Sequence, residues 1–311
     1  MLVSVIVTTY NRANVLPRCL DSLLAQTYKP LEIIVVDDGS TDDTHKLFES
    51  DYAYQNIEYV RLSANCGVTI ARNKGLDIFR GDAYMIWDSD DILYDHCIQE
   101  LVNVLDSDNS IGVVTAPGDY IQHGVKLPFR VLPSTRISFE QKKRNALPPN
   151  ECIRLIRSEC GRGLRFEGRN QDFIYSDRLA RRCGWYHLEQ ALGQIYIKSD
   201  NNSLTLLRAR PNMKWAKERV KPYEDYIRDF GDMLSQIAPK EISHCAYGAA
   251  IGLLLSGELA KARSYVQLMQ KYDPGSKRTK AMWWLVKLPF ADTLFICIYR
   301  IRVLLSKYTN K

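Results

Sequence analysis

Three carboxylates crowd into one short stretch of this sequence. The stretch reads Asp88-Ser89-Asp90-Asp91, and the apolar run Tyr84 to Trp87 leads directly into it. Carboxylates this close repel one another unless a cation neutralises them, and ligands that are all oxygen suit a hard divalent ion such as Mg²⁺ or Mn²⁺. The apolar run has the length of a buried strand. We therefore expect a divalent metal at the end of a parallel strand, and an ordinary solvated acidic turn is the alternative.

The elements that must position these carboxylates follow a regular order in the N-terminal half. Runs of apolar and β-branched residues predict strands at 2–8, 31–36, 57–62, 83–87 and 111–115, with amphipathic helical segments between them. Such alternation predicts right-handed crossovers and a mostly parallel, twisted α/β sheet flanked by helices. Ser40 and Asp95 are the expected N-caps of two of these helices.

Polar clusters follow four successive strands of this expected sheet. They occupy residues 8–12, 37–40, 65–67 and 88–91. Ligands of open α/β sheets bind outside the carboxyl ends of the strands, so we expect the clusters to converge on one crevice. The sequence has neither a GxGxxG nor a GxxxxGK[ST] phosphate-binding loop. A diphosphate bound in the crevice would therefore need a carboxylate-bound cation to stabilise it as a leaving group.

Individual side chains in the crevice suit a nucleotide. Asp38 follows the second strand and is placed to accept from a nucleobase N–H or a ribose hydroxyl, although a plain turn aspartate before Gly39 fits equally well. Tyr10 is expected to stack on a base or simply to pack. Arg72 is expected to meet phosphate oxygens.

Four segments of the chain resemble the family-2 glycosyltransferases of the GT-A fold. They are Val3–Arg12, Ile34–Asp42, Ala71–Gly75 and Asp88–Asp91, in that order within residues 1–115. The resemblance implies an enzyme that transfers a sugar from a nucleoside-diphosphate donor, usually UDP-linked, with inversion at the anomeric carbon.

The same resemblance implies roles for individual residues. The donor-binding residues are expected to be Thr8, Tyr10, Arg12, Asp38, Arg72 and Asp88. Thr8, Tyr10 and Asp38 would contact the nucleoside. Arg72 would lie near the ribose or diphosphate and Asp88 near the ribose. Asp90 would hold the metal, Mn²⁺ or Mg²⁺.

An inverting transfer by single displacement also needs a general base for the acceptor hydroxyl. Residues 161–184 offer Glu167, Asp172 and Asp177. Gln171-Asp172-Phe173 is similar to the Glu-Asp pair that opens an amphipathic helix in the family, so Asp172 is the expected base, with helix capping as its alternative role. Gln171 departs from the family's usual glutamate.

A later stretch, Tyr196 to Thr205, resembles the closing segment of the family. That segment often carries a histidine near the metal or diphosphate, and this sequence has none there. Lys198 and Asp200 are candidate substitutes, and the absence of this function is the alternative.

The expected organisation has two parts. Residues 1–210 form the glycosyltransferase domain, with a nucleotide-sugar half at 1–115 and an acceptor half at 116–210, and residues 211–311 form a helical appendage. The formal net charge is +6, but the segment Pro274–Lys311 carries eight Lys or Arg and one acid, so the rest of the chain sums to −1. Basic residues interleaved with tryptophans and aliphatic residues suit a helix on an anionic membrane surface, with packing on the domain as the alternative. This local charge argues against a general nucleic-acid binder.

Composition limits the cellular setting that we expect. The content of hydrophobic residues is 46% and of charged residues 25%, which is typical of globular proteins. Eight cysteines without a CxxC pair argue against a zinc site or a secreted disulfide framework. No signal peptide or membrane-spanning run is expected. The expected location is the cytoplasm, peripherally on the inner face of the cytoplasmic membrane.

Several activities fit parts of this pattern. The leading hypothesis is a metal-dependent inverting glycosyltransferase that acts on a glycan or lipid-linked acceptor in surface polysaccharide biosynthesis. The alternatives are a nucleotidyltransferase-like enzyme and a non-catalytic, membrane-associated scaffold with a degenerate transferase domain. A glycoside hydrolase would also use two carboxylates, but it needs neither a nucleoside pocket nor a metal.

Overall fold

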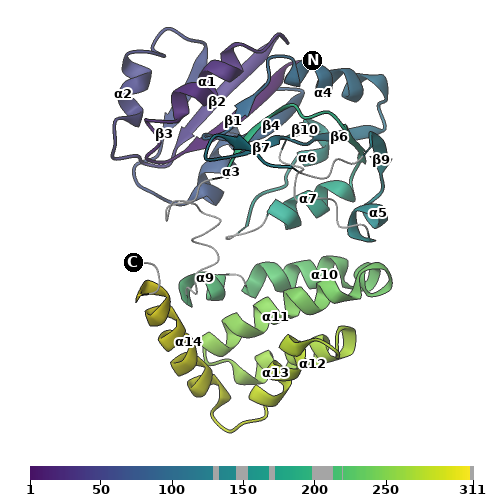
Figure 1. Cartoon of the computed structure of the whole chain (residues 1–311). Helices are drawn as coiled ribbons and strands as arrows, with labels where there is room; N and C mark the ends of the chain where they lie inside the picture. Colours follow the sequence, from purple (N-terminus) through teal and green to yellow (C-terminus); the bar gives the residue numbers. More distant parts are fainter. Residues whose placement is uncertain (129–132, 145–152, 168–171, 198–212, 219, 309–311) are drawn as a thin grey trace. The chain divides into compact units, whose positions relative to one another are not determined.

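The computed structural model describes residues 1–128, 133–144, 153–167, 172–197, 213–218 and 220–308. These residues form two compact units (Figure 1). The first is built from residues 1–166 and 172–198, and the second consists mainly of the helices that follow. The boundary expected between residues 210 and 211 lies outside the described residues.

A mixed sheet forms the centre of the first unit, with the strand order β3-β2-β1-β4-β10-β6-β11-β9 among the described residues. The strands are β1 (Val3–Thr9), β2 (Leu31–Asp37), β3 (Ile57–Arg61), β4 (Ala83–Asp88), β6 (Ile111–Ala116), β9 (Thr135–Ile137), β10 (Ile153–Arg157) and β11 (Gly184–His187). The first four pair in parallel, whereas β10 runs antiparallel between β4 and β6. The predicted α/β class is thus confirmed, and the continuous parallel block lies at β1 to β4.

Helices cover both faces of this sheet (Figure 1). Alternate residues of β1 face opposite sides: Val5 packs in one apolar cluster with Leu20, and Ile6 packs in another with Leu76. The first cluster includes residues of α1 (Leu16–Leu24) and α4 (Cys97–Ser107), and the second includes residues of α3 (Val68–Ile78), α6 (Ser158–Gly161) and α7 (Asp172–Ala180). The period of two in the strand therefore determines which helix packs on which face.

Both predicted N-caps are wrong. α2 (Thr44–Glu49) has Asp43 at its N-cap, and α4 has His96 there. The hydroxyl of Ser40 instead donates to the buried carboxylate of Asp37 at 2.5 Å and accepts from the backbone N–H of Asn11 at 2.8 Å. Ser40 thus joins the ends of β1 and β2, which explains why it is unavailable to the helix.

A smaller sheet lies beside the Asp88–Asp91 stretch. Its order is β5-β12-β7-β8, formed by β5 (Ile92–Leu93), β12 (Gly193–Tyr196), β7 (Asp119–Gln122) and β8 (Val125–Lys126). β12 pairs with β5 immediately after the acidic stretch. The chain near residue 196 is thereby brought next to residues 88–91. The short helix α5 (Phe139–Arg144) completes the described elements of this unit.

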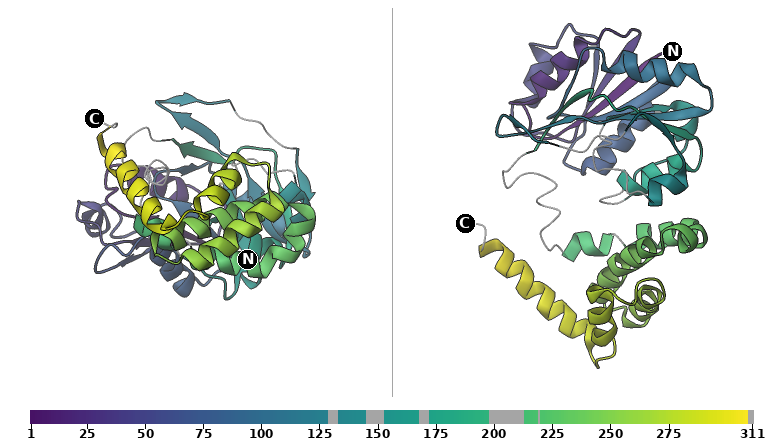
Figure 2. Two further views of the ribbon diagram at one scale, coloured as in Figure 1. Left: turned by 90° about the horizontal axis from the view of Figure 1, so that it is seen from below. Right: turned by 45° about the vertical axis from the view of Figure 1, so that its right-hand side comes forward.

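The second unit is a helical bundle. Its described helices are α9 (Met213–Glu218), α10 (Val220–Ile237), α11 (Pro239–Leu255), α12 (Leu259–Tyr272), α13 (Lys277–Leu285) and α14 (Ala291–Tyr308). The two views of Figure 2 show α10, α11 and α12 as neighbouring helices of this bundle. Its core contains Ala250, Leu253, Val266 and Met282.

Candidate active site

The polar clusters at the strand ends converge, as the sequence predicts. β1 lies between β2 and β4, and its residue Thr8 is paired with Val36 on one side and Asp88 on the other. Beyond the strands, the backbone N–H of Asp38 donates to the carbonyl of Thr9 at 2.9 Å. The carboxyl ends of these strands therefore meet at one edge of the sheet, the edge at which such folds bind ligands.

Asp38 is held firmly by its neighbours. Its carboxylate accepts from the backbone N–H groups of Cys66 at 2.7 Å and Gly67 at 2.8 Å. Burial raises the pKa of Asp38, and these two hydrogen bonds oppose the shift. Gly39 has φ +73°, and a Cβ there would lie 2.5 Å from the backbone carbon of Ala64, so only glycine fits the turn. Asp38 thus has the structural role that the sequence left open, in addition to any donor contact.

Asp90 lies in the turn that follows β4 and contacts two arginines. Its carboxylate forms an ion pair with Arg12. Its backbone carbonyl accepts from Nη2 of Arg18 at 2.5 Å. The guanidinium of Arg18 also lies 3.6 Å from the centre of the Tyr196 ring. Arg18 therefore links the acidic stretch to the smaller sheet, a role that no local sequence pattern indicates.

Asp91 is a buried carboxylate that contacts the smaller sheet, and the sequence did not indicate this role. It is 7% exposed, and its Oδ1 accepts from the backbone N–H of Tyr196 at 2.8 Å. Burial, followed by the negative charge of Asp88, raises the pKa of Asp91 to about 8. Asp91 therefore anchors β12 beside the candidate site, and a cation bound nearby would favour its ionised form.

Arg72 connects two carboxylates that are far apart in the sequence. From α3 its Nη2 lies 3.2 Å from Oδ1 of Asp88, and its Nη1 forms an ion pair with Asp172. Asp172 is the first residue of α7, so the predicted start of that helix is confirmed. The side chains of Asp88 and Asp172 are 56% and 52% exposed. Both carboxylates are therefore accessible to a ligand while one guanidinium holds them together.

The other predicted site residues fall into different surroundings. Thr8 is buried at the crevice end of β1, and Tyr10 is 40% exposed just beyond it. Asp177, the alternative base, is buried in ion pairs with Lys142 at 3.4 Å and with Lys143, so it stabilises the fold of α7. Lys198 and Asp200 lie outside the described residues.

The carboxylates at this edge fit a divalent cation that is shared with a substrate. The described residues contain no group of three or more His, Cys, Asp or Glu side chains able to enclose a metal on its own. Mg²⁺ and its analogues are commonly held by one or two carboxylates together with substrate phosphates. Asp90 and Asp88 supply oxygen ligands of that kind, and Arg12 neutralises Asp90 in this structure. The donor set thus fits a metal that arrives with a diphosphate.

Comparison with known proteins identifies the family. The family model described as glycosyl transferase family 2 matches residues 4–167, which is more than half of the chain. This chain belongs to glycosyltransferase family 2. The match extends from β1 to the residues just before Asp172, so it includes the acidic stretch and Arg72. Membership of this family favours sugar transfer over the nucleotidyltransferase alternative.

Curated relatives of this family-2 chain are similar over the same region. One is an uncharacterized glycosyltransferase, YibD, from Escherichia coli, with 31% identity over 136 residues, 43% of this chain and 39% of the relative. Another is glycosyltransferase GlyG from Streptococcus pneumoniae, with 36% identity over 115 residues, 36% of this chain and 38% of the relative. The chain therefore spans less than half the length of these relatives.

Solved structures share the fold of this family-2 chain. The structure of S. aureus TarS 1-349 in complex with UDP-GlcNAc superposes with a TM-score of 0.64 at 16% identity, and covers 99% of this chain and 92% of that chain. A structure of the same protein without a named ligand gives a TM-score of 0.59. The GT-A fold and the helical C-terminal region are thus both found in a known structure.

Proposed function

We propose that this protein is an inverting glycosyltransferase. It transfers a sugar from a UDP-sugar, or another nucleoside-diphosphate sugar, to a glycan or lipid-linked acceptor in the biosynthesis of a surface polysaccharide. The reaction is a single displacement that uses a divalent metal, Mn²⁺ or Mg²⁺, and an aspartate base. Residues 1–210 form the catalytic domain and residues 211–311 a membrane-associating region.

The observation that carries this proposal is the position of Arg72. Its guanidinium pairs with both Asp88 and Asp172. Asp88 is close in sequence to the expected metal ligand Asp90, and Asp172 is the expected base. A displacement needs the leaving group and the nucleophile on opposite sides of one reacting carbon. In the proposed site, Asp88 and Asp90 lie on the side of the leaving group and Asp172 on the side of the nucleophile.

The donor class is inferred from the crevice and from the TarS complexes. Thr8, Tyr10 and Asp38 lie at the end of β1 and of its neighbour β2, and we assign the nucleoside to this place. TarS has been crystallised with UDP-GlcNAc and with UDP on the same fold. Asp38 accepts from the base or ribose, and Arg12 and Arg72 supply positive charge beside the diphosphate.

The chain's own residues perform the chemistry as follows. Asp172 accepts the proton of the acceptor hydroxyl as that oxygen attacks the anomeric carbon. Arg72 orients Asp172 before the acceptor binds and offers its charge to the departing diphosphate. A divalent metal held by Asp90 would neutralise the leaving diphosphate. Asp91 and Arg18 hold the smaller sheet against this edge.

The test of this function is a panel of nucleotide sugars assayed for nucleotide release with and without Mn²⁺. We expect at least one UDP-sugar to be turned over, with release stimulated by Mn²⁺ and lost on chelation. Release that is independent of the metal would contradict the proposed cofactor. No release from any nucleotide sugar in the presence of acceptor extracts would contradict the proposed activity.

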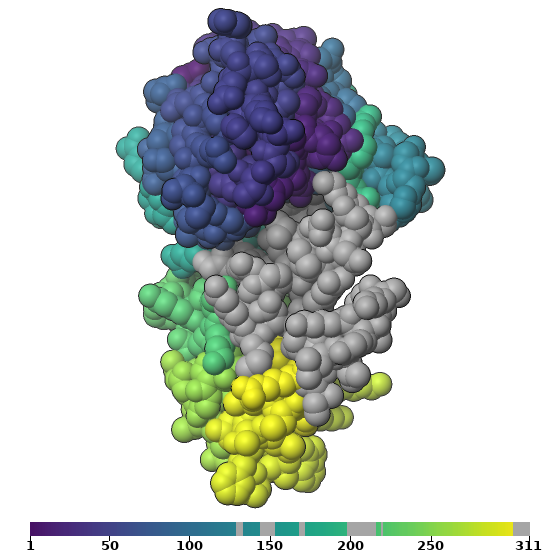
Figure 3. All heavy atoms as spheres, turned by 90° about the vertical axis from the view of Figure 1, so that its left-hand side faces the viewer, coloured from purple at the N-terminus to yellow at the C-terminus, as the bar shows by residue number. Residues whose placement is uncertain are grey.

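The last two helices support a peripheral membrane location. Large apolar side chains are exposed between residues 284 and 298: Trp284 at 70%, Leu288 at 45%, Phe290 at 78%, Leu294 at 43% and Ile298 at 52%. Figure 3 shows the C-terminal helices, in yellow, at the surface of the second unit. Exposed cations accompany them at Lys277, Lys280, Lys287 and Arg300. No helix among the described residues is long and apolar enough to cross a bilayer.

This pattern of residues suits an anionic lipid surface. Apolar side chains enter the headgroup boundary while lysines remain at the phosphates. We expect the protein to sediment with vesicles that contain phosphatidylglycerol and much less with phosphatidylcholine alone. The double variant Trp284→Ser, Phe290→Ser is expected to weaken vesicle binding by roughly tenfold or more, since each large apolar side chain contributes about 1.5–3 kcal/mol when buried.

Tyr54→Ser provides the matched control, because Tyr54 is a 99% exposed aromatic residue of the first unit. It should bind vesicles as the unaltered protein does. Equal binding by the double variant would instead indicate that the apolar residues serve a protein contact.

A further inference from the structure

Two cysteines distant in the sequence meet at one place in the first unit. Cys160 lies in α6 and Cys183 follows α7. The Cys183 thiol donates to the backbone carbonyl of Leu179 at 3.5 Å. A Cβ placed on Gly112 would lie 2.3 Å from Sγ of Cys160 and 2.6 Å from Sγ of Cys183. The two sulfurs are therefore within about 5 Å of each other over the bare backbone of Gly112.

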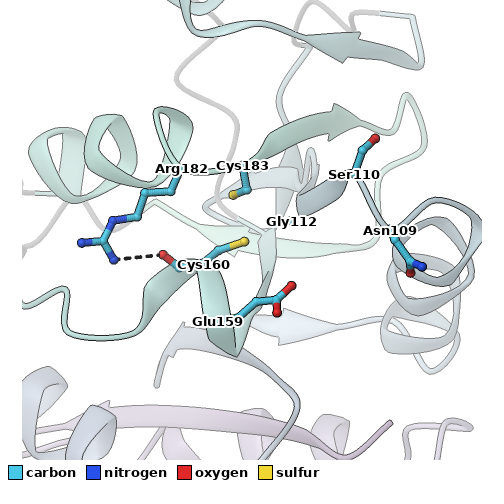
Figure 4. A pocket seen from close by; sticks show the side chains of 7 residues that line it. All are labelled: Asn109, Ser110, Gly112, Glu159, Cys160, Arg182 and Cys183. Carbon is cyan, nitrogen blue, oxygen red and sulfur yellow. Dashed lines mark hydrogen bonds between the residues drawn. The ribbon is translucent and has the colours of Figure 1, made fainter.

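The pair lines a pocket with polar walls. Figure 4 shows both sulfurs directed into this pocket of about 330 Å³, together with Asn109, Ser110, Glu159 and Arg182. The guanidinium of Arg182 donates to the backbone carbonyls of Arg162 at 2.8 Å and Cys160 at 3.3 Å. A small polar reagent therefore has a route to the thiols, beside a fixed positive charge.

This pocket is separate from the candidate active site. β4 and β6 are both antiparallel to β10, so they run in the same direction. Gly112 is near the start of β6, whereas Asp88 is at the end of β4. The two places therefore lie at opposite edges of the sheet, and sugar transfer does not explain the cysteine pair.

The environment distinguishes this pair from other cysteines of the chain. The neighbouring Cys183 thiol lowers the pKa of Cys160, as do the charges of Arg157 and Arg182, whereas burial and the charge of Glu159 oppose this shift. The proximity of Cys160, and then burial, raise the pKa of Cys183. Cys19 and Cys97 are fully buried, and burial raises their pKa values. Because the thiolate is the reactive form, Cys160 is the attacking residue.

We propose that Cys160 and Cys183 form a reversible dithiol–disulfide site that reacts with hydrogen peroxide. The thiolate of Cys160 attacks a peroxide oxygen and breaks the O–O bond, which gives a sulfenic acid and hydroxide that is protonated to water. The Cys183 sulfur then attacks the Cys160 sulfur, the S–S bond forms, and a second water leaves. Two thiols lose two electrons and two protons, and one peroxide becomes two waters.

The disulfide would hold both ends of the segment that carries Asp172. Residues 160 and 183 flank α7 and the loop before it, so the bond closes a loop that begins and ends beside β6. A cross-link of this kind restricts the unfolded chain. We expect oxidation to raise the thermal unfolding temperature by about 5 °C. The role of Asp172 in this segment rests on the proposed transferase function. The oxidation of the two cysteines does not.

The experiment uses the reduced full-length protein, treated with hydrogen peroxide and analysed by intact mass and peptide mapping. We expect the loss of two hydrogens, a peptide pair joining Cys160 to Cys183, and full reversal by dithiothreitol. Cys183→Ser should stop at a sulfenic acid on Cys160 that dimedone traps, and Cys160→Ser should lose both products. Gly112→Ala should lower the disulfide yield severalfold, because its methyl group would displace the thiols.

Cys297→Ser is the control, since Cys297 is an exposed cysteine of the second unit. It should form the 160–183 disulfide as the unaltered protein does. The proposal is overturned if folded protein keeps both thiols while Cys66 or Cys297 is oxidised, or if the linked peptides join other cysteines. These readouts need no sugar substrate, so a failed transferase assay leaves them interpretable.

Discussion

Replacing Asp172 with asparagine is expected to lower the rate of sugar transfer by roughly 10²–10⁴-fold, the usual contribution of a positioned general base. Asparagine occupies the same space at the start of α7 but cannot accept the proton of the acceptor hydroxyl. Donor binding should persist, since the crevice around Asp38 is unaltered. The measurement is single-turnover transfer, together with titration of the donor nucleotide.

Asp172 also pairs with Arg72, so the variant needs a control that separates chemistry from local structure. Glu167→Gln makes the same change of charge on an exposed residue that precedes Asp172 in the sequence and was the alternative candidate base. It should retain most of the activity. Transfer that survives in Asp172→Asn and disappears in Glu167→Gln would exchange the two assignments.

Replacing Asp90 with asparagine is expected to remove the stimulation of nucleotide release by Mn²⁺. A metal at the leaving group contributes several kcal/mol, so the loss should be roughly 10²-fold or more at saturating metal. The change also frees Arg12, which pairs with Asp90 in this structure. Residual metal-independent release is therefore a second quantity to compare with that of the unaltered protein.

Asp43→Asn is the matched control for Asp90→Asn. Asp43 is a largely exposed acid at the N-cap of α2 and pairs only peripherally, with Lys46 at 2.7 Å. Its replacement should leave the response to Mn²⁺ intact. Metal stimulation that is equal in Asp90→Asn and Asp43→Asn would place the cation elsewhere.

Much of the fold was predictable because its signals are local. Short runs of β-branched residues indicate buried parallel strands, and apolar residues that recur with a period near 3.6 indicate amphipathic helices. The strands β1 to β4 follow from such windows of a few residues, whereas the start of α7 at Asp172 was implied by the family resemblance. The N-cap predictions at Ser40 and Asp95 were wrong because a cap depends on which partner the side chain actually meets.

The site was predictable only in outline. The rule that ligands bind at the carboxyl ends of parallel strands placed residues 8–12, 37–40, 65–67 and 88–91 at one edge. It could not say that Asp38 would be held by two backbone amides, or that Asp177 would be buried against lysines of α5. Both contacts join segments that are far apart in the sequence, so no local sequence pattern indicates them.

The sequence by itself determined the alternation of strands and helices, the edge of the sheet at which the polar strand ends converge, and the family. Only the tertiary structure decided the partners of the charged residues: Arg12 with Asp90, Arg18 with Tyr196, and Arg72 with both Asp88 and Asp172. The physical reason is the separation of the interacting residues along the sequence. Periodicity is set by neighbours along the chain, whereas an ion pair between residues 72 and 172 depends on how every intervening crossover packs.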